Sequence, residues 1–389
     1  MNPSPVAEEP APGWPALDLA VRVVAWQGTH GRHGLPWQDT QDPYRVWLSE
    51  IMLQQTQVST VLGYYARFLE RFPTVRDLAG AAQEDVLALW SGLGYYARAR
   101  NLHRCAQVVV QEHGGEFPRS AEGLAQLPGI GRSTAAAIAA FCWGERVAIL
   151  DGNVKRVLTR VLAYEGDLAS ATAERDLWAR ATQLLPAAAE GPGLRASMAA
   201  YTQGLMDLGA TVCTLRAPAC PACPVAPVCQ AAARGLQARY PVKTRKLKRG
   251  ARSAALLWLR HGQRTWLVRR PAPGVWAGLW SLPEFADDEA LERVVANWPG
   301  TLEWLAPVHH VLTHFDWALQ PVRLDWHGDP GQAWQGEIDA LPPVSPGTTV
   351  AGAVASGPVT ECHGRWAEPG ELAALGLPAP IRKLIDPAA

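Results

Sequence analysis

Four of the chain's seven cysteines lie within residues 213–229, close enough in sequence to bind metal. They are Cys213, Cys220, Cys223 and Cys229, in the spacing C-x6-C-x2-C-x5-C. Thiolates in such a cluster bind a zinc ion or hold an iron–sulfur cluster, and the spacing alone leaves both open. The segment follows a long stretch of helical pattern. Helices must therefore position the four-cysteine segment, and the residues of those helices indicate the function of the protein.

Two carboxylates stand in surroundings that suit acid–base work. Glu50 lies among Trp47, Leu48 and Ile51, so burial should raise its pKa toward the neutral range that a general acid needs. Asp151 comes directly before a Gly-Asn turn and an amphipathic segment. There it would cap a helix and be held rigid and ionised. Taken alone, each residue also has an ordinary interpretation, as a surface glutamate and as a helix cap.

A glycine-rich turn separates two helical patterns at about 124–143, in the stretch LPGIGRSTAAAIAAF. Gly129 and Gly131 permit positive φ and let a phosphate approach the backbone. The helix beginning at Arg132 would aim its N–H groups and its dipole at that anion. This pattern predicts a helix-hairpin-helix that grips DNA without reading bases. A tight hairpin of two helices with no ligand is the alternative.

The segment WSGLGYYARARNLH, residues 90–103, combines exposed aromatic residues with arginines. Its glycines should break the helix and expose Leu93, Tyr95 and Tyr96, with one tyrosine buried and the other free to stack on bases. A buried aromatic pair at a helix corner is the alternative. Upstream, Gln55 and Thr56 carry an amide and a hydroxyl that could probe base edges or fill a gap in a duplex.

Composition and pattern divide the chain into four parts. Residues 1–15 read as a disordered Pro-rich tail, and residues 16–230 as an all-helical region with no alternating strand pattern. Residues 231–252 form a basic linker, which could be solvated or could meet a phosphate backbone. Residues 253–389 read as a small α+β domain with two strand pairs and one amphipathic helix. A multi-domain chain follows.

Charge and hydropathy exclude some classes of protein. The formal net charge is zero, so total charge does not favour nucleic acid. The N-terminus lacks a signal-peptide pattern, and the longest purely apolar run, 135–143, is far shorter than the ~20 residues of a membrane span. Cysteine use does not resemble a disulfide framework. We therefore expect a cytoplasmic protein with no membrane contact.

Together these motifs resemble the helix-hairpin-helix DNA glycosylases that carry an iron–sulfur cluster, and most closely the adenine DNA glycosylases, the MutY family. The matching stretches occur in the family's order: LPWQ, WLSEIMLQQTQV, GLGYYARARNLH, LPGIGRSTA, ILDGNVKRVL, MDLGA and the four-cysteine loop. The resemblance implies a [4Fe–4S] cluster on the four cysteines and a monomeric, nucleoid-associated base-excision-repair enzyme. Its expected substrate is duplex DNA with adenine opposite 8-oxoguanine or guanine.

The resemblance also implies residue roles. Glu50 would donate a proton to the adenine, and Asp151 would stabilise the cationic sugar. Related endonuclease III-type enzymes carry a lysine nucleophile where this chain has Ser133, so the lyase route should be lost and the enzyme should be monofunctional. Further expected roles are catalytic support for Asn153 and Ser133, DNA binding for Gln55, Thr56, Leu93, Tyr95, Gly129, Gly131 and Arg132, and base-pocket walls for Trp37 and Gln203.

The C-terminal part resembles the Nudix fold of the MutT type, which in this family recognises 8-oxoguanine. Gly278 and Glu284 keep the opening of the Nudix motif, but residues 292–297 lack its paired glutamates. Metal-dependent pyrophosphatase activity should therefore be absent. The family's Phe-Ser-His lesion-reading loop aligns with a Leu-Thr-His stretch, which assigns lesion recognition to Thr313 and His314. The lost aromatic residue puts the detail of that contact in question.

Three rival functions stay open at this point. An endonuclease III-like pyrimidine glycosylase–lyase is disfavoured by Ser133 and by the extra C-terminal domain. A non-catalytic iron–sulfur protein that binds DNA damage is disfavoured by the pair Glu50 and Asp151. A nucleotide-pool pyrophosphatase is disfavoured by Ala296 and Asn297.

Overall fold

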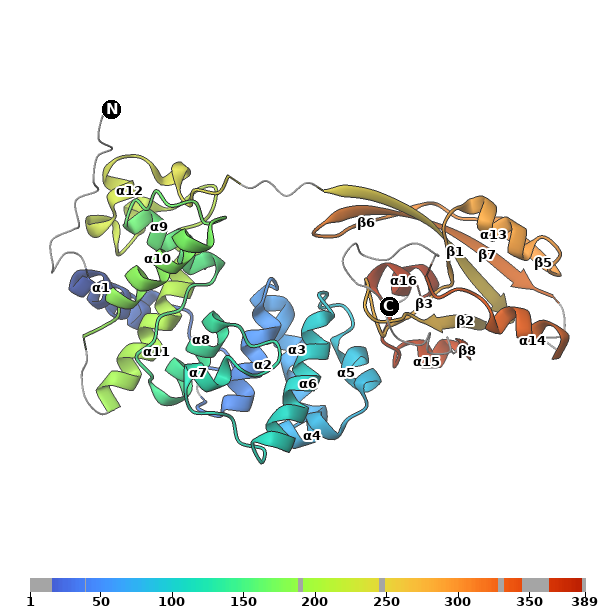
Figure 1. Cartoon of the computed structure of the whole chain (residues 1–389), viewed down its shortest axis with the longest axis horizontal. Coiled ribbons are helices and arrows are strands. Elements are labelled where there is room, and N and C mark those ends of the chain that lie inside the picture. Colours follow the sequence, from blue (N-terminus) through green and yellow to red (C-terminus); the bar gives the residue numbers. More distant parts are fainter. Residues whose placement is uncertain are drawn as a thin grey trace. The chain divides into compact units, whose positions relative to one another are not determined.

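The computed structural model describes residues 16–38, 40–187, 192–244, 249–327, 332–344 and 364–386. The chain divides into two compact units, the first formed by 1–55 and 108–246 and the second by 56–107 and 247–389. Figure 1 labels the elements of both units in chain order. The expected disordered tail, 1–15, lies outside the described residues.

Helices and short turns make up the first unit. Its elements are α1 (Ala16–His30), α2 (Pro43–Leu53), the end of α6 (Ala97–Glu112), α7 (Ala121–Leu124), α8 (Arg132–Trp143), α9 (Gly152–Val161), α10 (Ala171–Gln183), α11 (Pro192–Asp207), η1 (Leu208–Val212), η2 (Cys220–Ala222), η3 (Ala226–Val228), α12 (Gln230–Ala233) and η4 (Gln237–Arg239). The described part of this unit contains no strand. The all-helical expectation is confirmed there.

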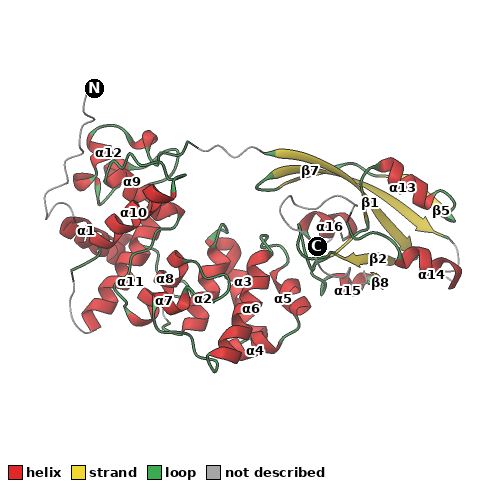
Figure 2. Ribbon diagram, in the orientation of Figure 1, coloured by secondary structure: helices red, strands yellow, loops and turns green. Residues whose placement is uncertain are grey.

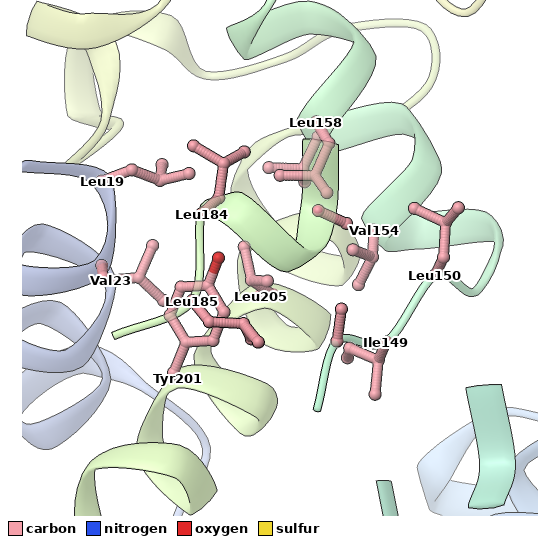
Figure 3. Packing of buried hydrophobic residues seen from close by; sticks show 14 of the residues in the cluster. Leu19, Val23, Ile149, Leu150, Val154, Leu158, Leu184, Leu185, Tyr201 and Leu205 are labelled. Carbon is pink, nitrogen blue, oxygen red and sulfur yellow. The ribbon is translucent and has the colours of Figure 1, made fainter. Parts of the chain in front are cut away.

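The core of the first unit fixes the chain on both sides of Asp151. Leu150 and Val154 are 3% and 0% exposed and belong to one buried cluster. Figure 3 shows Val154 and Leu158 of α9 and Leu150 ahead of it, with Leu19 and Val23 of α1 in the same cluster. The amphipathic face expected of this helix is therefore its buried face. Burial on both sides holds the Asp151 backbone in one conformation.

The second unit begins with the helices α3 (Val58–Arg71), α4 (Val75–Gly80), α5 (Gln83–Trp90) and the start of α6. Their aromatic core stacks edge to face, with the Phe68 ring centroid 5.2 Å from that of Phe72 and 6.0 Å from that of Trp90. Thr74 caps α4 through a reciprocal hydrogen bond with Asp77. This packing leaves the α5–α6 loop at the edge of the helical group.

A mixed sheet completes the second unit, and Figure 2 shows the change from helices to strands at β1. The sheet order is β3-β2-β1-β7-β5. Three further strands pair with members of this series: β4 with β1, β6 with β7, and β8 with β2. Its elements are β1 (Gly250–His261), β2 (Arg264–Arg269), β3 (Trp280–Ser281), β4 (Glu284–Phe285), α13 (Asp288–Val295), β5 (Gly300–Trp304), β6 (Val308–Val311), β7 (Phe315–Trp326), α14 (Gln332–Asp339), β8 (Gly364–Ala367), α15 (Pro369–Leu372) and α16 (Ala379–Ile385).

Both expected strand pairs are present in this sheet. Strands β1 and β2 pair antiparallel across the turn at Gly262, and β6 pairs antiparallel with β7. The central strands β1 and β7 run parallel, which the sequence did not predict. The α+β class of the C-terminal part is confirmed. None of the helices in the described residues is long and apolar enough to cross a membrane.

Candidate active site

Glu50 lies near the end of α2 and lines a large cavity. Asp42 caps the helix by accepting a hydrogen bond from Tyr44 N (2.9 Å), and the neighbours Trp47 and Ile51 are buried. The cavity next to Glu50 has a volume of about 990 Å³. Burial, and secondarily the charge of Asp151, raise the pKa of Glu50 from 4.5 to about 7. A carboxyl with that pKa can give and take a proton near neutral pH.

The same cavity contains both residues expected to form a base pocket. Trp37 is 7% exposed and lines it with Gln203 of α11. Residues that the sequence did not predict also line the cavity, among them His33, Gln41, Phe141, Trp143 and Arg195. Trp143 is the last residue of α8, directly before the C-cap glycine Gly144. No local sequence pattern indicates that a side chain at this position lines a pocket.

A buried carboxylate holds Gln203 in place. Asp207 is 0% exposed and accepts hydrogen bonds from Gln203 Nε2 (2.8 Å), Arg32 N (2.8 Å) and Arg32 Nε (2.6 Å). Asp207 is the acid of the MDLGA stretch. That stretch matches the family, but the sequence alone indicated no role for its aspartate. A lone acid within an apolar helical stretch was the available signal.

Asp151 caps α9 and is electrostatically coupled to Glu50. Its Oδ1 accepts a hydrogen bond from Val154 N (2.8 Å), and its charge contributes to the raised pKa of Glu50. The Ser133 hydroxyl accepts a hydrogen bond from Leu150 N (3.0 Å). Ser133 therefore fixes the residue before Asp151 through the backbone. The arrangement brings together two carboxylates in different environments.

The side-chain hydrogen bond of Asn153 and the ion pair of Lys155 are with groups other than Asp151. Asn153 Oδ1 accepts a hydrogen bond from Arg156 Nη2 (2.9 Å), and Arg156 Nε donates to Cys213 O (2.8 Å). The first turn of α9 is thus joined to the start of the cysteine loop. Lys155 Nζ pairs with Glu174 Oε1 at 2.5 Å. That ion pair engages the ammonium group.

All four cysteines of the C-x6-C-x2-C-x5-C motif line one small pocket beside α9. Arg160, only 2% exposed, donates from Nη1 to Cys213 Sγ (3.3 Å), and Gln237 Nε2 donates to Cys220 Sγ (3.5 Å). Among the described residues, no three His, Cys, Asp or Glu side chains are grouped so that they could hold a single metal ion. Four thiolates with N–H donors around an apolar pocket fit a cluster in which each sulfur binds its own iron.

The expected hairpin has an exposed turn. Gly129 adopts φ +77°, and Gly131 is the N-cap of α8 with no side-chain cap. No heavy atom of the described residues lies within 4 Å of a Cβ added at Gly131. Both glycines and Arg132 are exposed. The Arg132 guanidinium lies 4.0 Å from the Trp178 ring centroid. The free N–H groups of this helix start are available to an anion.

Two of the expected DNA-contacting residues are exposed in strained backbone. Gln55 has φ +57° and Tyr95 has φ +48°, although neither is glycine, and Tyr95 is 49% exposed. Such conformations persist only where surrounding structure enforces them, and they cluster at functional sites. Tyr96 is 7% exposed, so the expectation of one buried and one exposed tyrosine is confirmed.

The expectation that Leu93 is exposed is wrong. Its side chain is 6% exposed because the turn between Gly92 and Gly94 folds it inward, leaving Tyr95 as the outward residue. Thr56 is partly buried, and its hydroxyl accepts a hydrogen bond from Arg98 Nη2 (3.1 Å). The Arg98 guanidinium also lies 5.5 Å from the Tyr95 ring centroid. Arg98 thus joins Thr56 to the Tyr95 loop.

In the sheet domain, Thr313 and His314 are exposed in the turn between β6 and β7. Glu284, the retained glutamate of the Nudix opening, is 1% exposed and pairs with Arg270 Nη1 at 2.7 Å. Arg270 is itself 3% exposed. Glu284 is therefore neutralised inside the fold.

The family models match the two parts of the chain separately. A model described as HhH-GPD superfamily base excision DNA repair protein matches residues 48–183, and a NUDIX domain model matches residues 254–387. The adenine DNA glycosylase of Buchnera aphidicola subsp. Acyrthosiphon pisum is 35% identical over 308 residues, covering 78% of this chain and 85% of that protein. The human adenine DNA glycosylase is 34% identical over 385 residues, covering 80% of this chain and 69% of that protein. The chain therefore belongs to the adenine DNA glycosylase family, enzymes of base excision repair.

Proposed function

We propose that this enzyme hydrolyses the N-glycosidic bond of adenine paired with 8-oxoguanine or guanine in duplex DNA, as a monofunctional glycosylase. One observation carries the proposal: Glu50, with a pKa raised to about 7 by burial and by the charge of Asp151, lines a cavity of about 990 Å³. That volume accommodates an extruded base. A carboxyl of that pKa can protonate a leaving base at neutral pH.

The reaction begins when the adenine leaves the stack, at a cost of a few kcal/mol. The base enters the cavity between Trp37 and Gln203, and the bond from Gln203 to Asp207 fixes the orientation of that amide. Glu50 in its protonated form donates its proton to a ring nitrogen of the adenine. The departing base is then neutral, and the C–N bond breaks with its electron pair going to the base.

Asp151 acts on the sugar that remains. As a carboxylate it stabilises the oxocarbenium ion or adds to it covalently, and water then completes the hydrolysis with Glu50 as the base. Two carboxylates in different environments are the arrangement that glycoside hydrolysis requires. The hydrogen bond of Ser133 to Leu150 N supports this role by fixing the chain next to Asp151. Asn153 supports it at the start of α9, through Arg156.

The DNA-binding roles rest on exposure and on backbone geometry. Gly129, Gly131 and Arg132 anchor phosphates at the start of α8, where N–H groups have no side-chain cap. Gln55 fills the gap left by the extruded base, and Tyr95 wedges the neighbouring step. Thr56 holds the Tyr95 loop through Arg98.

Lesion recognition belongs to the exposed β6–β7 turn. The Thr313 hydroxyl and the His314 ring can hydrogen-bond the purine edge of 8-oxoguanine. The ion pair between Glu284 and Arg270 supports a domain that binds without hydrolysing, because Glu284 is not available to a metal ion. No observation favours a nucleotide pyrophosphatase.

A [4Fe–4S] cluster on Cys213, Cys220, Cys223 and Cys229 completes the helical region. The cluster supplies a cross-link that shapes the loop between η1 and α12, and no step of the reaction passes through it. We expect Cys220→Ser to lose iron and to weaken DNA binding or folding before it slows base release by the bound, folded fraction.

The test is a single-turnover assay on four duplexes, carrying A·8-oxoguanine, A·G, A·T and an oxidised pyrimidine. The proposal expects adenine release from the first two, with strand breaks appearing only after alkali. Release of the pyrimidine, or efficient strand cleavage with borohydride trapping, would establish the glycosylase–lyase instead. Binding of the mismatches without release of any base would establish a non-catalytic damage-binding protein. Size-exclusion chromatography with light scattering tests the monomer.

A further inference from the structure

The loop that carries Tyr95 is tied to the C-terminal segment of the chain. Ser91 Oγ, at the end of α5, donates a hydrogen bond to Leu377 O (2.7 Å). Tyr96 OH donates to the same carbonyl (3.4 Å) and accepts from Gly92 N (3.3 Å). Leu377 is 0% exposed. A single buried carbonyl thus accepts hydrogen bonds from both ends of the Ser91–Tyr96 loop.

Arg382 of α16 reinforces this attachment. Its Nη2 donates to Ser91 Oγ (3.3 Å) and to Leu375 O (2.6 Å), and its Nη1 donates to Leu372 O (3.0 Å). The guanidinium therefore satisfies the carbonyls that end α15 and reaches across to the loop. Bonds from one rigid planar group to several carbonyls leave those partners little freedom.

The neighbouring surfaces fit closely enough to hold this contact in one arrangement. An added Cβ at Gly376 would lie 3.3 Å from backbone atoms of Leu87 and Ala88 in α5. Arg100 Nη1 donates to Ala277 O (2.9 Å), and Arg269 Nη1 pairs with Glu84 Oε1 at 2.7 Å. These contacts also join α5 and α6 to the domain that carries Thr313 and His314.

Tyr95 lies within this loop, and its side chain is 49% exposed. Its φ of +48° costs energy for a residue with a side chain. Trp90 Nε1 and Arg98 Nη2 hold the middle of the loop through Gly94 O, and the bonds at Ser91 and Tyr96 attach its two ends to the C-terminal segment. Tyr64 OH adds a further bond, to Ser91 O (2.7 Å). Because both ends of the six-residue loop are held, the Tyr95 side chain is kept pointing outward.

We propose that Ser91, Tyr96 and Arg382, acting through Leu377 O, are positioning residues that let the C-terminal domain hold Tyr95 in its stack-opening conformation. The inference rests on the proposed function, in which Tyr95 wedges the base step. It adds that the domain reading the lesion also sets the conformation of the loop that opens the stack. Loosening this contact removes wedging while leaving Glu50, Asp151 and the cavity intact.

The experiment uses the full-length protein and the double variant Ser91→Ala/Tyr96→Phe, which removes both hydroxyls and no packing atoms of the domain. The probe is a duplex with 2-aminopurine beside 8-oxoguanine, and with 2′-fluoro-2′-deoxyadenosine, whose glycosidic bond resists hydrolysis, opposite it. Fluorescence at saturating protein reports unstacking of the step. Tyr95→Ala is the reference for a lost wedge. Ser281→Ala is the matched control, because its buried Oγ has no hydrogen-bond partner within the part of the chain that the structure describes.

We expect the double variant to lose most of the fluorescence rise, approaching Tyr95→Ala, and to release adenine from A·8-oxoguanine roughly tenfold more slowly. Ser281→Ala should match the unsubstituted protein in both assays. If the double variant does not fold, Ser91→Ala and Tyr96→Phe are measured singly, with intermediate losses expected.

Two other results separate the inference from the function beneath it. A full fluorescence rise in the double variant, with a low signal in Tyr95→Ala, overturns the positioning role and leaves the proposed function standing. A full rise in Tyr95→Ala itself overturns the wedge, and with it this inference, whether or not adenine is released.

Discussion

Glu50 and Glu284 are both glutamates of sequence motifs, but their carboxyl groups lie in opposite environments in the two parts of the molecule. Glu50 lines an open cavity, and within the described residues it forms no ion pair. Its pKa is raised to about 7 by burial and by Asp151. Glu284 is 1% exposed and paired with Arg270. Glu50 thus faces a cavity with its pKa raised, whereas Glu284, bound to a buried guanidinium, is part of the structure.

The largest effect should follow from removing the acid. Glu50→Gln keeps the size and the hydrogen-bonding capacity of the side chain but cannot donate a proton to the base. We expect adenine release to fall below detection, while DNA binding stays within about tenfold. Single-turnover kinetics and a binding titration measure the two effects.

The control for that substitution is Glu112→Gln, which neutralises an exposed glutamate at the end of α6. It should release adenine at the unsubstituted rate. Normal turnover by Glu50→Gln would remove Glu50 from the chemistry and end the contrast with Glu284.

The next effect concerns the partner carboxylate. Asparagine caps helices about as well as aspartate, so Asp151→Asn should preserve α9 while losing the charge that faces the sugar. We expect release to slow by roughly 10²- to 10³-fold, as when one electrostatic stabiliser is lost. The same substitution removes the secondary cause of the raised Glu50 pKa, so that pKa should move downward. An unchanged rate would show that capping is the whole role of Asp151.

Glu284→Gln should affect stability and leave chemistry alone. It leaves the Arg270 guanidinium buried without its counter-charge, which costs about 3 kcal/mol of unfolding free energy. Denaturant unfolding followed by tryptophan fluorescence measures the loss. The folded fraction should release adenine at the normal rate, and a loss of release without a loss of stability would contradict the structural role.

The smallest effect is expected at the lesion-reading turn. Thr313→Val removes an exposed hydroxyl, and a single hydrogen bond contributes about 1 kcal/mol, or about fivefold in a ratio of rates. We therefore expect the preference for A·8-oxoguanine over A·G to drop about fivefold, with release from A·G unchanged. An equal slowing on both duplexes would place Thr313 in folding or general DNA binding.

Features written in neighbouring residues were predictable from the sequence. The apolar face of α9, the Asp151 cap, the positive φ at Gly129 and the β1–β2 turn at Gly262 all depend on local periodicity or turn chemistry. These features indicated the helical and α+β parts of the fold and the place of Asp151, whereas Glu50 was singled out by its apolar neighbours Trp47, Leu48 and Ile51.

Features that depend on distant residues were not predictable. The burial of Leu93 and the support of Gln203 by Asp207 and Arg32 depend on which segments pack together. Likewise, β8 pairs with β2 from about a hundred residues away, as the pairing of Thr265 with Ala367 shows. Local patterns carry no information about such pairings.

The pH dependence of single-turnover adenine release tests the central claim most directly. If Glu50 donates its proton with a pKa of about 7, release from A·8-oxoguanine should be fast below that pH and should fall tenfold for each unit above it. Glu50→Gln should show no such limb in any residual activity. A rate that stays level from pH 6 to pH 9, with DNA binding saturated throughout, would contradict the assignment of Glu50 as the general acid.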